Sequence, residues 1–345
     1  MKKGISKNHV GSKNTIRAPR MKILVTGATG FIGSHLTERL IEEGYSVKAL
    51  ARKSSGLSLL KSLGVEIVYG DIRDAAAVEK AVKGCERVYH LAAATSWQRS
   101  SRQEHCAVNV KGTGNVARAA VKASVGRFIY GSTVGVYGLI KNSPIDEHTE
   151  PNPNTPYRES KLLGEEMVLS YHKRENLPVV IARLSSVIGP RSFNWLGLFQ
   201  AIARKRFRII GSGENHTHMG YITDVVDGLR LCAETAGIEG KSYLIAGKET
   251  IKLKQLVDMI AQELEVITSS RRSPEFPFRV FCRLAAVVYR RFGFELPRAH
   301  SYELFITDRV LNISKAQKEL GYDPKASLRE GIRQTIEWYR KNGYL

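Results

Sequence analysis

The fold is decided by the stretch Thr26-Gly27-Ala28-Thr29-Gly30-Phe31-Ile32-Gly33 of this 345-residue chain. The apolar run Ile23-Leu24-Val25 precedes it, and a helical pattern with Leu36, Leu40 and Ile41 on one face follows it. This order predicts a strand, a tight glycine turn, and a helix whose N-terminus can bind a pyrophosphate. The spacing G-x-x-G-x-x-G is one residue off the commoner G-x-G-x-x-G fingerprint, but the context on both sides favours dinucleotide binding.

Composition and cysteine usage indicate an ordinary globular protein. Hydrophobic residues make up 43% and charged residues 25% of the chain, which is long enough for one large domain or two smaller ones. The cysteines Cys85, Cys106, Cys232 and Cys282 lie far apart and form no C-x-x-C pair, so we expect no disulfide framework and a cytoplasmic location. No apolar run approaches the roughly 20 residues that span a bilayer.

The unusual bulk property is a formal net charge of +20. Residues 1–20 carry six basic and no acidic side chains, and they are rich in Ser, Asn and Gly, so we expect a disordered basic tail there. The remaining charge favours anionic cofactors, membrane surfaces or nucleic acid. No nucleic-acid-binding motif accompanies it, so we expect a generally basic enzyme with a small-molecule substrate and no nucleic-acid partner.

Strands alternate with helices along the first part of the chain. The alternation predicts an α/β fold with a doubly wound parallel Rossmann sheet. After the turn strand, the expected strands are 46–50, 66–69, 87–91, 127–130 and 179–183, and the expected helices are 34–43, 74–83, 105–123 and 157–176.

The pattern changes after residue 190. We predict an NAD(P)-binding domain over 21–190 and a smaller C-terminal α/β substrate domain over 191–345, with about 221–247 returning to the first domain. The second part should contain helices at 195–204, 251–264 and 328–341 and a strand at 243–245. It should cover the carboxyl edge of the sheet, where ligands bind in such folds.

The pattern Tyr-x-x-x-Lys occurs twice, at Tyr137/Lys141 and at Tyr157/Lys161. The first copy lies in a stretch rich in turn residues. The second follows Thr155-Pro156, which predicts a helix N-cap with proline at the first helical position. Residues four apart share one helical face, so Lys161 should stand beside Tyr157.

Such a pair suits proton transfer. A free tyrosine has a pKa near 10, and a neighbouring ammonium lowers it by stabilising the phenolate. A phenol tuned in this way can protonate an alkoxide or deprotonate an alcohol. The alternative interpretation is a surface Tyr and Lys on an amphipathic helix.

Further motifs appear in a specific order. They are Gly70-Asp71-Ile72, His90-Leu91-Ala92-Ala93, Asn109-Val110-Lys111-Gly112-Thr113, Ser132-Thr133-Val134-Gly135-Val136-Tyr137-Gly138, and Leu320-Gly321-Tyr322 with Glu337-Trp338-Tyr339. With the glycine turn and Tyr157–Lys161, this set resembles the extended short-chain dehydrogenase/reductase family, also called NAD-dependent epimerase/dehydratases, over about residues 21–342.

The resemblance implies roles for individual residues. Tyr157 is the general acid/base, Lys161 lowers its pKa and binds the nicotinamide ribose, and Thr133 polarises the substrate oxygen. Asn109 holds helix geometry or a water near Lys161, or is purely structural. The family also implies a homodimer. The implied cofactor site consists of Gly27, Thr29, Gly30, Phe31, Ile32, Gly33, Arg52, Asp71, Ile72, Leu91, Ala92, Ala93, Asn109, Tyr157 and Lys161.

The segment after the second strand bears on the choice of cofactor. NAD-preferring relatives usually carry an acid there for the ribose hydroxyls, whereas this chain reads Leu50-Ala51-Arg52-Lys53. A similar arginine in flavonol-reductase-like members faces the 2′-phosphate of NADP. We therefore favour NADP over NAD. The alternative is that Arg52 stacks on adenine in an NAD enzyme.

Departures from the family pattern bear on the substrate. Ser186 replaces the asparagine that sugar epimerases usually carry, the approach 216–220 has no arginine, and no R-x-G-D motif is present. Val134 and Gly135 stand where sugar 4,6-dehydratases carry acids after the catalytic threonine, so we exclude a dehydratase. We expect a ketone reductase or alcohol dehydrogenase on a hydrophobic or non-nucleotide substrate bound near Ser186 and Trp195. The alternatives are a nucleotide-sugar 4-epimerase and a non-catalytic NAD(P)-sensing protein.

Two further features have alternative interpretations. In 277–294 we expect a helix with Phe278, Phe281, Leu284, Ala285 and Val288 on one face, flanked by Arg279, Arg283, Arg290 and Arg291. It is either a core helix with a basic edge, or an apolar substrate lid or membrane-surface helix. This segment resembles hydroxysteroid-dehydrogenase-like and flavonol-reductase-like members of the family more than sugar epimerases. The pair His216-x-His218 lacks a nearby third ligand, so we expect no metal site.

Overall fold

The centre of the molecule is a sheet of seven parallel strands, seen in a computed structural model that describes residues 21–95, 101–140, 142–267, 272–293, 295–296 and 299–345. The predicted tail at 1–20 lies outside these residues. The strand order is β10-β6-β5-β4-β1-β2-β3, which confirms the doubly wound Rossmann sheet. The strands are β1 (Lys22–Thr26), β2 (Ser46–Ala51), β3 (Glu66–Tyr69), β4 (Arg87–His90), β5 (Arg127–Thr133), β6 (Val179–Leu184) and β10 (Ser242–Ile245).

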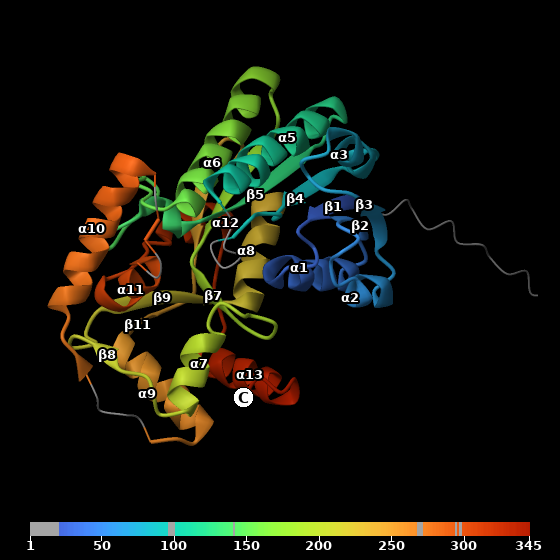
Figure 1. Ribbon diagram of the computed structural model, residues 1–345. Helices are drawn as coiled ribbons and strands as arrows, with labels where there is room; N and C mark the ends of the chain where they lie inside the picture. Colours follow the sequence, from blue (N-terminus) through green and yellow to red (C-terminus); the bar gives the residue numbers. More distant parts are fainter. Residues whose placement is uncertain (1–20, 96–100, 141, 268–271, 294, 297–298) are drawn as a thin grey trace, which may run out of the picture.

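Helices cover both faces of this sheet (Figure 1). On one face lie α3 (Ala75–Val82), α5 (Thr113–Lys122) and α6 (Pro156–Glu175), and on the other lie α1 (Phe31–Glu42) and α8 (Ile222–Glu234), with the short α2 (Ser58–Ser62) against α1. Because the strands are buried on both sides, they read as apolar runs rather than as alternating patterns. β10 pairs with β6 in parallel after α8, so the chain returns to the central sheet after residue 221.

The predicted helix at 105–123 is three elements. α4 (Arg102–His105) runs into a π-helix, η2 (Cys106–Gly112), and then into α5. π-helical turns are rare and often occur at functional sites. Here the widened turn contains Asn109, which is 1% exposed.

The remaining elements lie mostly beyond the carboxyl end of the sheet. They are β7 (Ser186–Ile188), α7 (Leu196–Ala203), β8 (Ile209–Ile210), β9 (His216–Tyr221), β11 (Thr250–Lys252), α9 (Leu253–Leu264), β12 (Arg272–Ser273), α10 (Phe276–Phe292), α11 (Ala299–Ile306), α12 (Ser314–Leu320) and α13 (Leu328–Lys341). Strands β11, β9 and β7 form a second sheet, and β12 pairs with β8.

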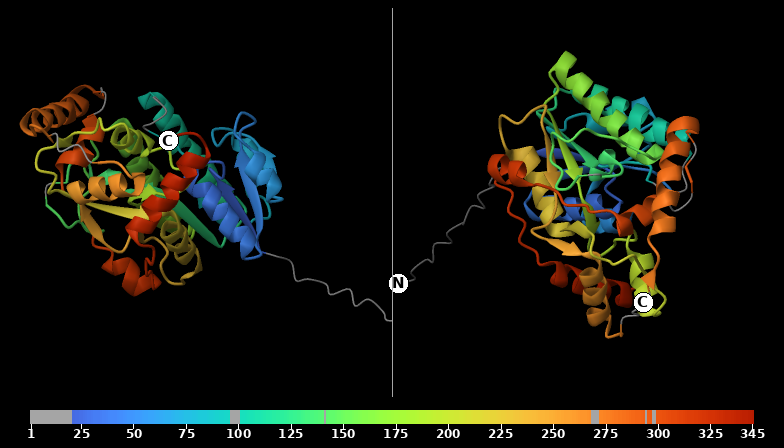
Figure 2. Two further views of the ribbon diagram at one scale, coloured as in Figure 1. Left: turned by 90° about the horizontal axis from the view of Figure 1, so that it is seen from below. Right: turned by 90° about the vertical axis from the view of Figure 1, so that its left-hand side faces the viewer.

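Helix α10 stands at the edge of the molecule (Figures 1 and 2), and most of its predicted apolar face does pack against the protein. Phe278 and Phe281 contact Tyr302 of α11, and Ala285 is buried. Leu284 is the exception within the predicted face, because it is 56% exposed. The apolar side chains of α10 extend over a wide arc, so periodicity did not separate Leu284 from the face that meets the core. Within the described residues, no helix combines the length and apolarity that a membrane crossing would need.

Candidate functional site

The glycine turn joins β1 to α1 in a conformation that other residues could not adopt. Gly27 has φ = +75°, and a Cβ there would lie 2.7 Å from the backbone nitrogen of Ala92. A Cβ on Gly33 would lie 2.1 Å from the carbonyl oxygen of Gly27. Gly30 is the N-cap residue of α1 and has no side chain to cap it, so the first N–H groups of the helix, at Phe31 and Ile32, can receive an anion. The turn fits the pyrophosphate of a dinucleotide.

A pocket opens beside this turn, at the ends of β2, β3 and β4. Its lining includes the predicted residues Gly27, Thr29, Arg52, Asp71, Ile72 and Ala92, and also Leu50, Ala51, Ser55, Gly70, Arg73, Ala94, Glu104 and Val108, which the sequence analysis missed. Asp71 accepts two hydrogen bonds of 2.9 Å from the guanidinium of Arg73, and these bonds lower the pKa of Asp71. The place of the pocket at the strand ends matches the adenosine half of a dinucleotide site.

Three buried side chains connect the ends of β1 and β4 to α5. His90 Nδ1 lies 2.7 Å from Thr26 Oγ1, and His90 Nε2 lies 2.9 Å from Thr113 Oγ1. Because Thr113 donates its own proton to the carbonyl of Asn109, His90 must donate from Nε2 and accept at Nδ1. Burial lowers the pKa of His90 to about 3, so the ring is neutral. The chain after β4, at Leu91 to Ala93, is fixed in this way next to the turn.

Asn109 links this segment to the helix that carries Tyr157. Its Oδ1 accepts from the backbone N–H of Ala94 at 2.8 Å, and its Nδ2 donates to the carbonyl of Ala94 and to Ser160 Oγ, both at 2.9 Å. Its partners among the described residues are therefore Ala94 and Ser160 rather than Lys161. The contact with Ser160 is one residue from Lys161, so Asn109 ties α6 to the segment after β4.

Helix α6 begins as the sequence predicts. Thr155 Oγ1 accepts from the N–H of Arg158 at 3.3 Å, and Pro156 lies in the first turn. Tyr157 and Lys161 are thus one turn apart on the same helix. The Nζ of Lys161 donates to the carbonyl of Gly131 at 2.7 Å and lies 4.1 Å from the centre of the Tyr130 ring.

The pKa of Tyr157 shifts against the sequence-based expectation. Burial raises the pKa of Tyr157 to about 12, and Arg158 opposes this only in part. Burial also lowers the pKa of Lys161 to about 7. At neutral pH, Tyr157 in this structure is therefore a protonated phenol, and a buried Lys161 carries its charge only partly.

Thr133 ends β5 and caps the short 3-10 helix η3 (Val134–Tyr137). Its Oγ1 accepts from the N–H of Gly135 at 3.0 Å, which leaves its own proton for another acceptor. The two residues after Thr133 are Val134 and Gly135, and both are buried. No acidic side chain therefore follows Thr133 at these positions. Since β5 contacts α6, Thr133, Tyr157 and Lys161 lie in neighbouring elements at the carboxyl edge of the sheet.

Glu165 is a residue of this region that the sequence analysis missed. It lies one turn beyond Lys161, is buried, and forms an ion pair of 2.7 Å with Arg183. It also accepts a hydrogen bond from Ser132. Arg183 donates to Tyr137 Oη at 2.7 Å. In the first Tyr-x-x-x-Lys copy, Tyr137 is therefore a structural partner of Arg183. Lys141 of that copy lies outside the described residues. The spacing of four residues from Tyr157 through Lys161 to Glu165 was the signal that could have revealed it.

The proposed substrate residues lie apart from the adenosine pocket. Ser186 begins β7 and is partly exposed, whereas Trp195 precedes α7 and is only 8% exposed within the main core. Neither lines the pocket beside the glycine turn. Their contact with substrate therefore stays a prediction.

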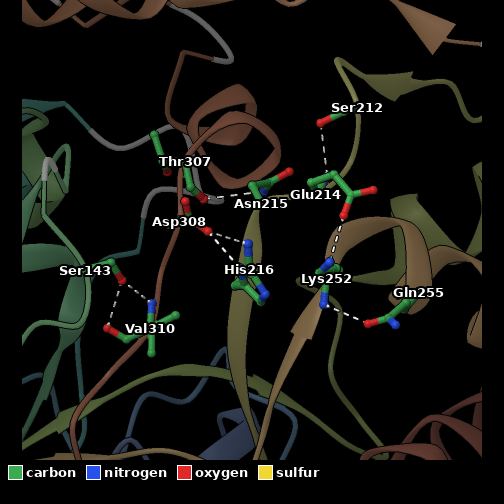
Figure 3. A network of polar contacts seen from close by, with 10 residues as sticks. All are labelled: Ser143, Ser212, Glu214, Asn215, His216, Lys252, Gln255, Thr307, Asp308 and Val310. Carbon is green, nitrogen blue, oxygen red and sulfur yellow. Dashed lines mark hydrogen bonds and ion pairs between the residues drawn. The ribbon is translucent and has the colours of Figure 1, made fainter.

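The two histidines of β9 hold neighbouring chain segments. Asp308 accepts hydrogen bonds from the backbone N–H of His216 at 2.7 Å and from its ring Nδ1 at 3.1 Å (Figure 3). His218 bonds the carbonyl of Gly247 at 2.7 Å and the N–H of Leu311 at 3.3 Å. Among the described residues, no group of three His, Cys, Asp or Glu side chains is arranged to hold a metal ion.

Arg309 is a second residue that the sequence analysis missed. Its backbone N–H donates to the carbonyl of His216 at 2.8 Å, so an arginine does lie beside the 216–220 approach. Its side chain is buried, and its Nη2 lies 3.5 Å from Glu303 Oε2. The same oxygen forms a closer ion pair of 2.6 Å with Nη1 of Arg158. Among the described residues, the Nε and Nη2 of Arg309 have no hydrogen-bond acceptor. Burial lowers the pKa of Arg309 to about 10.

We expect Lys161 to make stability depend on pH. Its pKa in the folded chain, about 7, is below its ordinary value of 10.5, so between these values the unfolded chain binds the extra proton. The free energy of unfolding should therefore fall as pH drops from about 10 to about 7, by up to ~1.4 kcal/mol per pH unit. Lys161→Met should lack this dependence in urea unfolding between about pH 7.5 and 9.5. Lys173→Met, at an exposed lysine of α6, should keep it; equal slopes for both variants would contradict the prediction.

Together, the Rossmann sheet and the glycine turn define a dinucleotide-dependent enzyme. The chain belongs to the NAD dependent epimerase/dehydratase family, whose model matches residues 23–246. Among known proteins it is similar to sterol demethylase protein B of Methylococcus capsulatus, with 31% identity over 94% of this chain and 100% of that one.

Solved structures show the same similarity. UDP-glucose 4-epimerase of Thermotoga maritima, solved with UDP-glucose, has a TM-score of 0.77 and 27% identity, and the match covers 93% of this chain and 99% of that one. The dTDP-glucose 4,6-dehydratase DesIV of Streptomyces venezuelae, solved with NAD, has a TM-score of 0.75 and 27% identity over 93% of this chain and 98% of that one.

Proposed function

We propose that this enzyme interconverts a secondary alcohol and a ketone on an apolar, non-nucleotide substrate with an NAD(P) cofactor. The observation that carries the proposal is the placement of Thr133 at the end of β5, with Tyr157 and Lys161 at the start of the neighbouring helix α6. In folds of this kind the carboxyl edge of the sheet is where ligands bind.

The same groups would serve ketone reduction and, in reverse, alcohol oxidation. Tyr157 is protonated at neutral pH because burial raises its pKa to about 12, so it can give a proton to a developing alkoxide. Thr133 can donate its free hydroxyl proton to the same oxygen. A nicotinamide, held through the glycine turn and the adenosine pocket, would supply the hydride. Lys161, bonded to the carbonyl of Gly131, would position the ribose.

Two observations support an apolar substrate. Ser186 stands in place of an amide side chain at β7, and His218 on β9 is already bonded to Gly247 and Leu311. These positions offer few anchors for a nucleotide diphosphate. The relative from Methylococcus capsulatus carries a sterol in its name, and a sterol alcohol is a substrate of the proposed kind.

A nucleotide-sugar epimerase is the second candidate, and Arg309 favours it. The guanidinium is buried next to β9 and keeps two N–H-bearing nitrogens without acceptors among the described residues. A diphosphate could accept from them. The match to a UDP-glucose 4-epimerase points in the same direction.

Turnover of external cofactor distinguishes the candidates. The protein is incubated with NADPH or NAD and, in separate reactions, an alicyclic ketone, a 3β-hydroxysteroid and UDP-glucose. Net oxidation or reduction of cofactor with either of the first two supports the proposal. Conversion of UDP-glucose to its 4-epimer without net cofactor turnover supports the second candidate. Cofactor binding without any reaction would indicate a sensor and contradict both.

We also propose a preference for NADP, based on Arg52. This residue is exposed at the end of β2 and lines the adenosine pocket, where its guanidinium can meet a 2′-phosphate. A charge-assisted bond of this kind contributes about 1.5–3 kcal/mol, so Arg52→Asp should weaken NADPH binding by about 10- to 150-fold and reverse the preference. Titration of both cofactors at one salt concentration measures this, with Lys53→Asp as the neighbouring-charge control. Preference of the unmodified protein for NAD would contradict the proposal.

A further inference from the structure

The outward face of α10 is apolar. Five of the ten large hydrophobic side chains that are exposed among the described residues lie on this one helix: Phe276, Val280, Leu284, Val287 and Phe292. Phe276, Val280, Leu284 and Val287 are spaced by three or four residues, so they form one stripe. Leu284 and Val287 are 56% and 60% exposed. A concentrated apolar surface of this kind marks an interaction site.

The inward face of α10 already packs against the rest of the protein. The exposed apolar stripe is therefore a second face of the helix and not its packing face. Cys282 and Phe281 pack with Ile306 and Tyr302 of α11. Tyr289 donates to Glu159 of α6 at 2.6 Å, and Arg290 donates to Asn152 at 2.8 Å. The helix is therefore fixed in one orientation, with the apolar stripe facing away from the protein.

Charge accompanies the stripe. The helix has four exposed arginines, Arg279, Arg283, Arg290 and Arg291, and no acidic residue between Phe276 and Phe292. Arg279 pairs with Glu275 at the start of the helix. Arg283 and Arg291 have no carboxylate within ion-pair distance among the described residues. The surface that covers this face must therefore be apolar at its centre and anionic at its edge.

We propose that the outward face of α10 docks this enzyme on an anionic lipid bilayer. A helix with an apolar stripe and arginines beside it lies in the plane of the membrane interface, with the stripe in the acyl boundary and the guanidinium groups at the phosphates. Seventeen residues with four arginines are unsuited to cross the bilayer, so the helix lies on the membrane. The net charge of +20 favours association with anionic surfaces in general, and the apolar stripe sets which face meets the membrane.

The docked face is close to the catalytic helix. Glu159, which receives the hydrogen bond of Tyr289, is two residues after Tyr157, and Arg102 of α4 pairs with the same carboxylate at 3.2 Å. An enzyme held at the membrane by α10 would therefore present the N-terminal end of α6 near the lipid surface. The start of α6 would then lie behind α10, about one helix diameter, or about 10 Å, from the docked surface.

Sedimentation with vesicles tests the proposal on the full chain. Vesicles of phosphatidylcholine and phosphatidylglycerol in a three-to-one ratio are compared with pure phosphatidylcholine at about 0.1 M salt. We expect binding to the anionic vesicles only. Arg283→Gln with Arg291→Gln should weaken it by about 30-fold, since each basic group near the surface contributes about fivefold. Leu284→Ser with Val287→Ser should weaken it by about tenfold or more.

Matched controls separate α10 from general charge and exposure. Arg118→Gln with Arg174→Gln removes two exposed arginines on α5 and α6, and Ile267→Ser removes a side chain that is 83% exposed outside α10; both should bind as the unmodified protein does. Unchanged circular dichroism checks that every variant is folded.

Several results would overturn the proposal. Binding that survives both α10 variants would assign it to another basic surface, including the six basic groups in 1–20. If the arginine controls on α5 and α6 lose as much vesicle binding as the α10 arginine variant, the binding depends on total charge and not on α10. A mass that doubles with concentration in light scattering without vesicles, and that Leu284→Ser with Val287→Ser returns to the single chain, would show that a second copy covers α10.

Discussion

Tyr157→Phe is expected to lower kcat by about 10²- to 10⁴-fold while the dissociation constant of the cofactor changes little. The substitution removes one oxygen, and with it the proton that a developing alkoxide would receive. The loss should appear in kcat because the proton is being transferred in the transition state but not in the bound ground state. The rate is followed by the absorbance of the reduced nicotinamide with whichever alcohol or ketone the protein turns over, and cofactor binding is followed by fluorescence.

The duplicate motif supplies the matched control. Tyr137→Phe also removes one phenol oxygen, but this oxygen bonds Arg183 and the carbonyl of Asp146. We expect a cost of about 1 kcal/mol in the free energy of unfolding and a kcat close to that of the unmodified protein. Near-normal kcat in Tyr157→Phe, or the same loss in a folded Tyr137→Phe, would contradict the assignment of the acid/base.

The parts of the site that could be predicted from sequence depend on local signals. The glycine turn is recognisable because Gly27 has a positive φ and Gly33 meets the backbone of Gly27 only six residues away. The start of α6 is recognisable because Thr155 bonds an N–H only three residues away. Contacts between residues only a few positions apart can be predicted from the order of the residues.

The missed residues depend on long-range contacts. Glu303 meets Arg158 across 145 positions, and no spacing in the sequence indicates that pair or the proximity of Arg309. The π-helical turn at Asn109 was missed for the same reason, because its amide is satisfied by Ala94 and by Ser160 of another helix. Pairs that lie this far apart in the sequence can be identified only from the folded structure, where the sheet brings the helices together.

The direction of the pKa shift at Tyr157 could not be predicted from the sequence either. A lysine four residues away indicates a lowered pKa, but the sequence does not show how much water surrounds the phenol. In the structure, burial outweighs the charge of Arg158 and raises the pKa of Tyr157 to about 12. The ammonium of Lys161 is meanwhile bonded to the carbonyl of Gly131. Desolvation depends on tertiary packing, so it cannot be deduced from helical spacing.

The second large effect is expected at Glu165. Glu165→Gln keeps the shape of the side chain but removes the only charge that the structure pairs with Arg183 within the described residues. Both side chains are almost completely buried, at 2% and 9% exposure. A buried charge left without its partner typically costs about 3–5 kcal/mol. Urea unfolding at neutral pH should therefore show a loss of that size in the free energy of unfolding.

The neighbouring Glu166 is the control for this experiment. It is exposed on the same helix, so Glu166→Gln should change the free energy of unfolding by less than about 0.5 kcal/mol. Glu165 also raises the pKa of Lys161, so its loss should push that pKa further down and reduce the charge beside Tyr157. A Glu165→Gln protein as stable as the Glu166→Gln protein would show that Arg183 finds another partner, and that the ion pair does not hold β5, β6 and α6 together beneath the site.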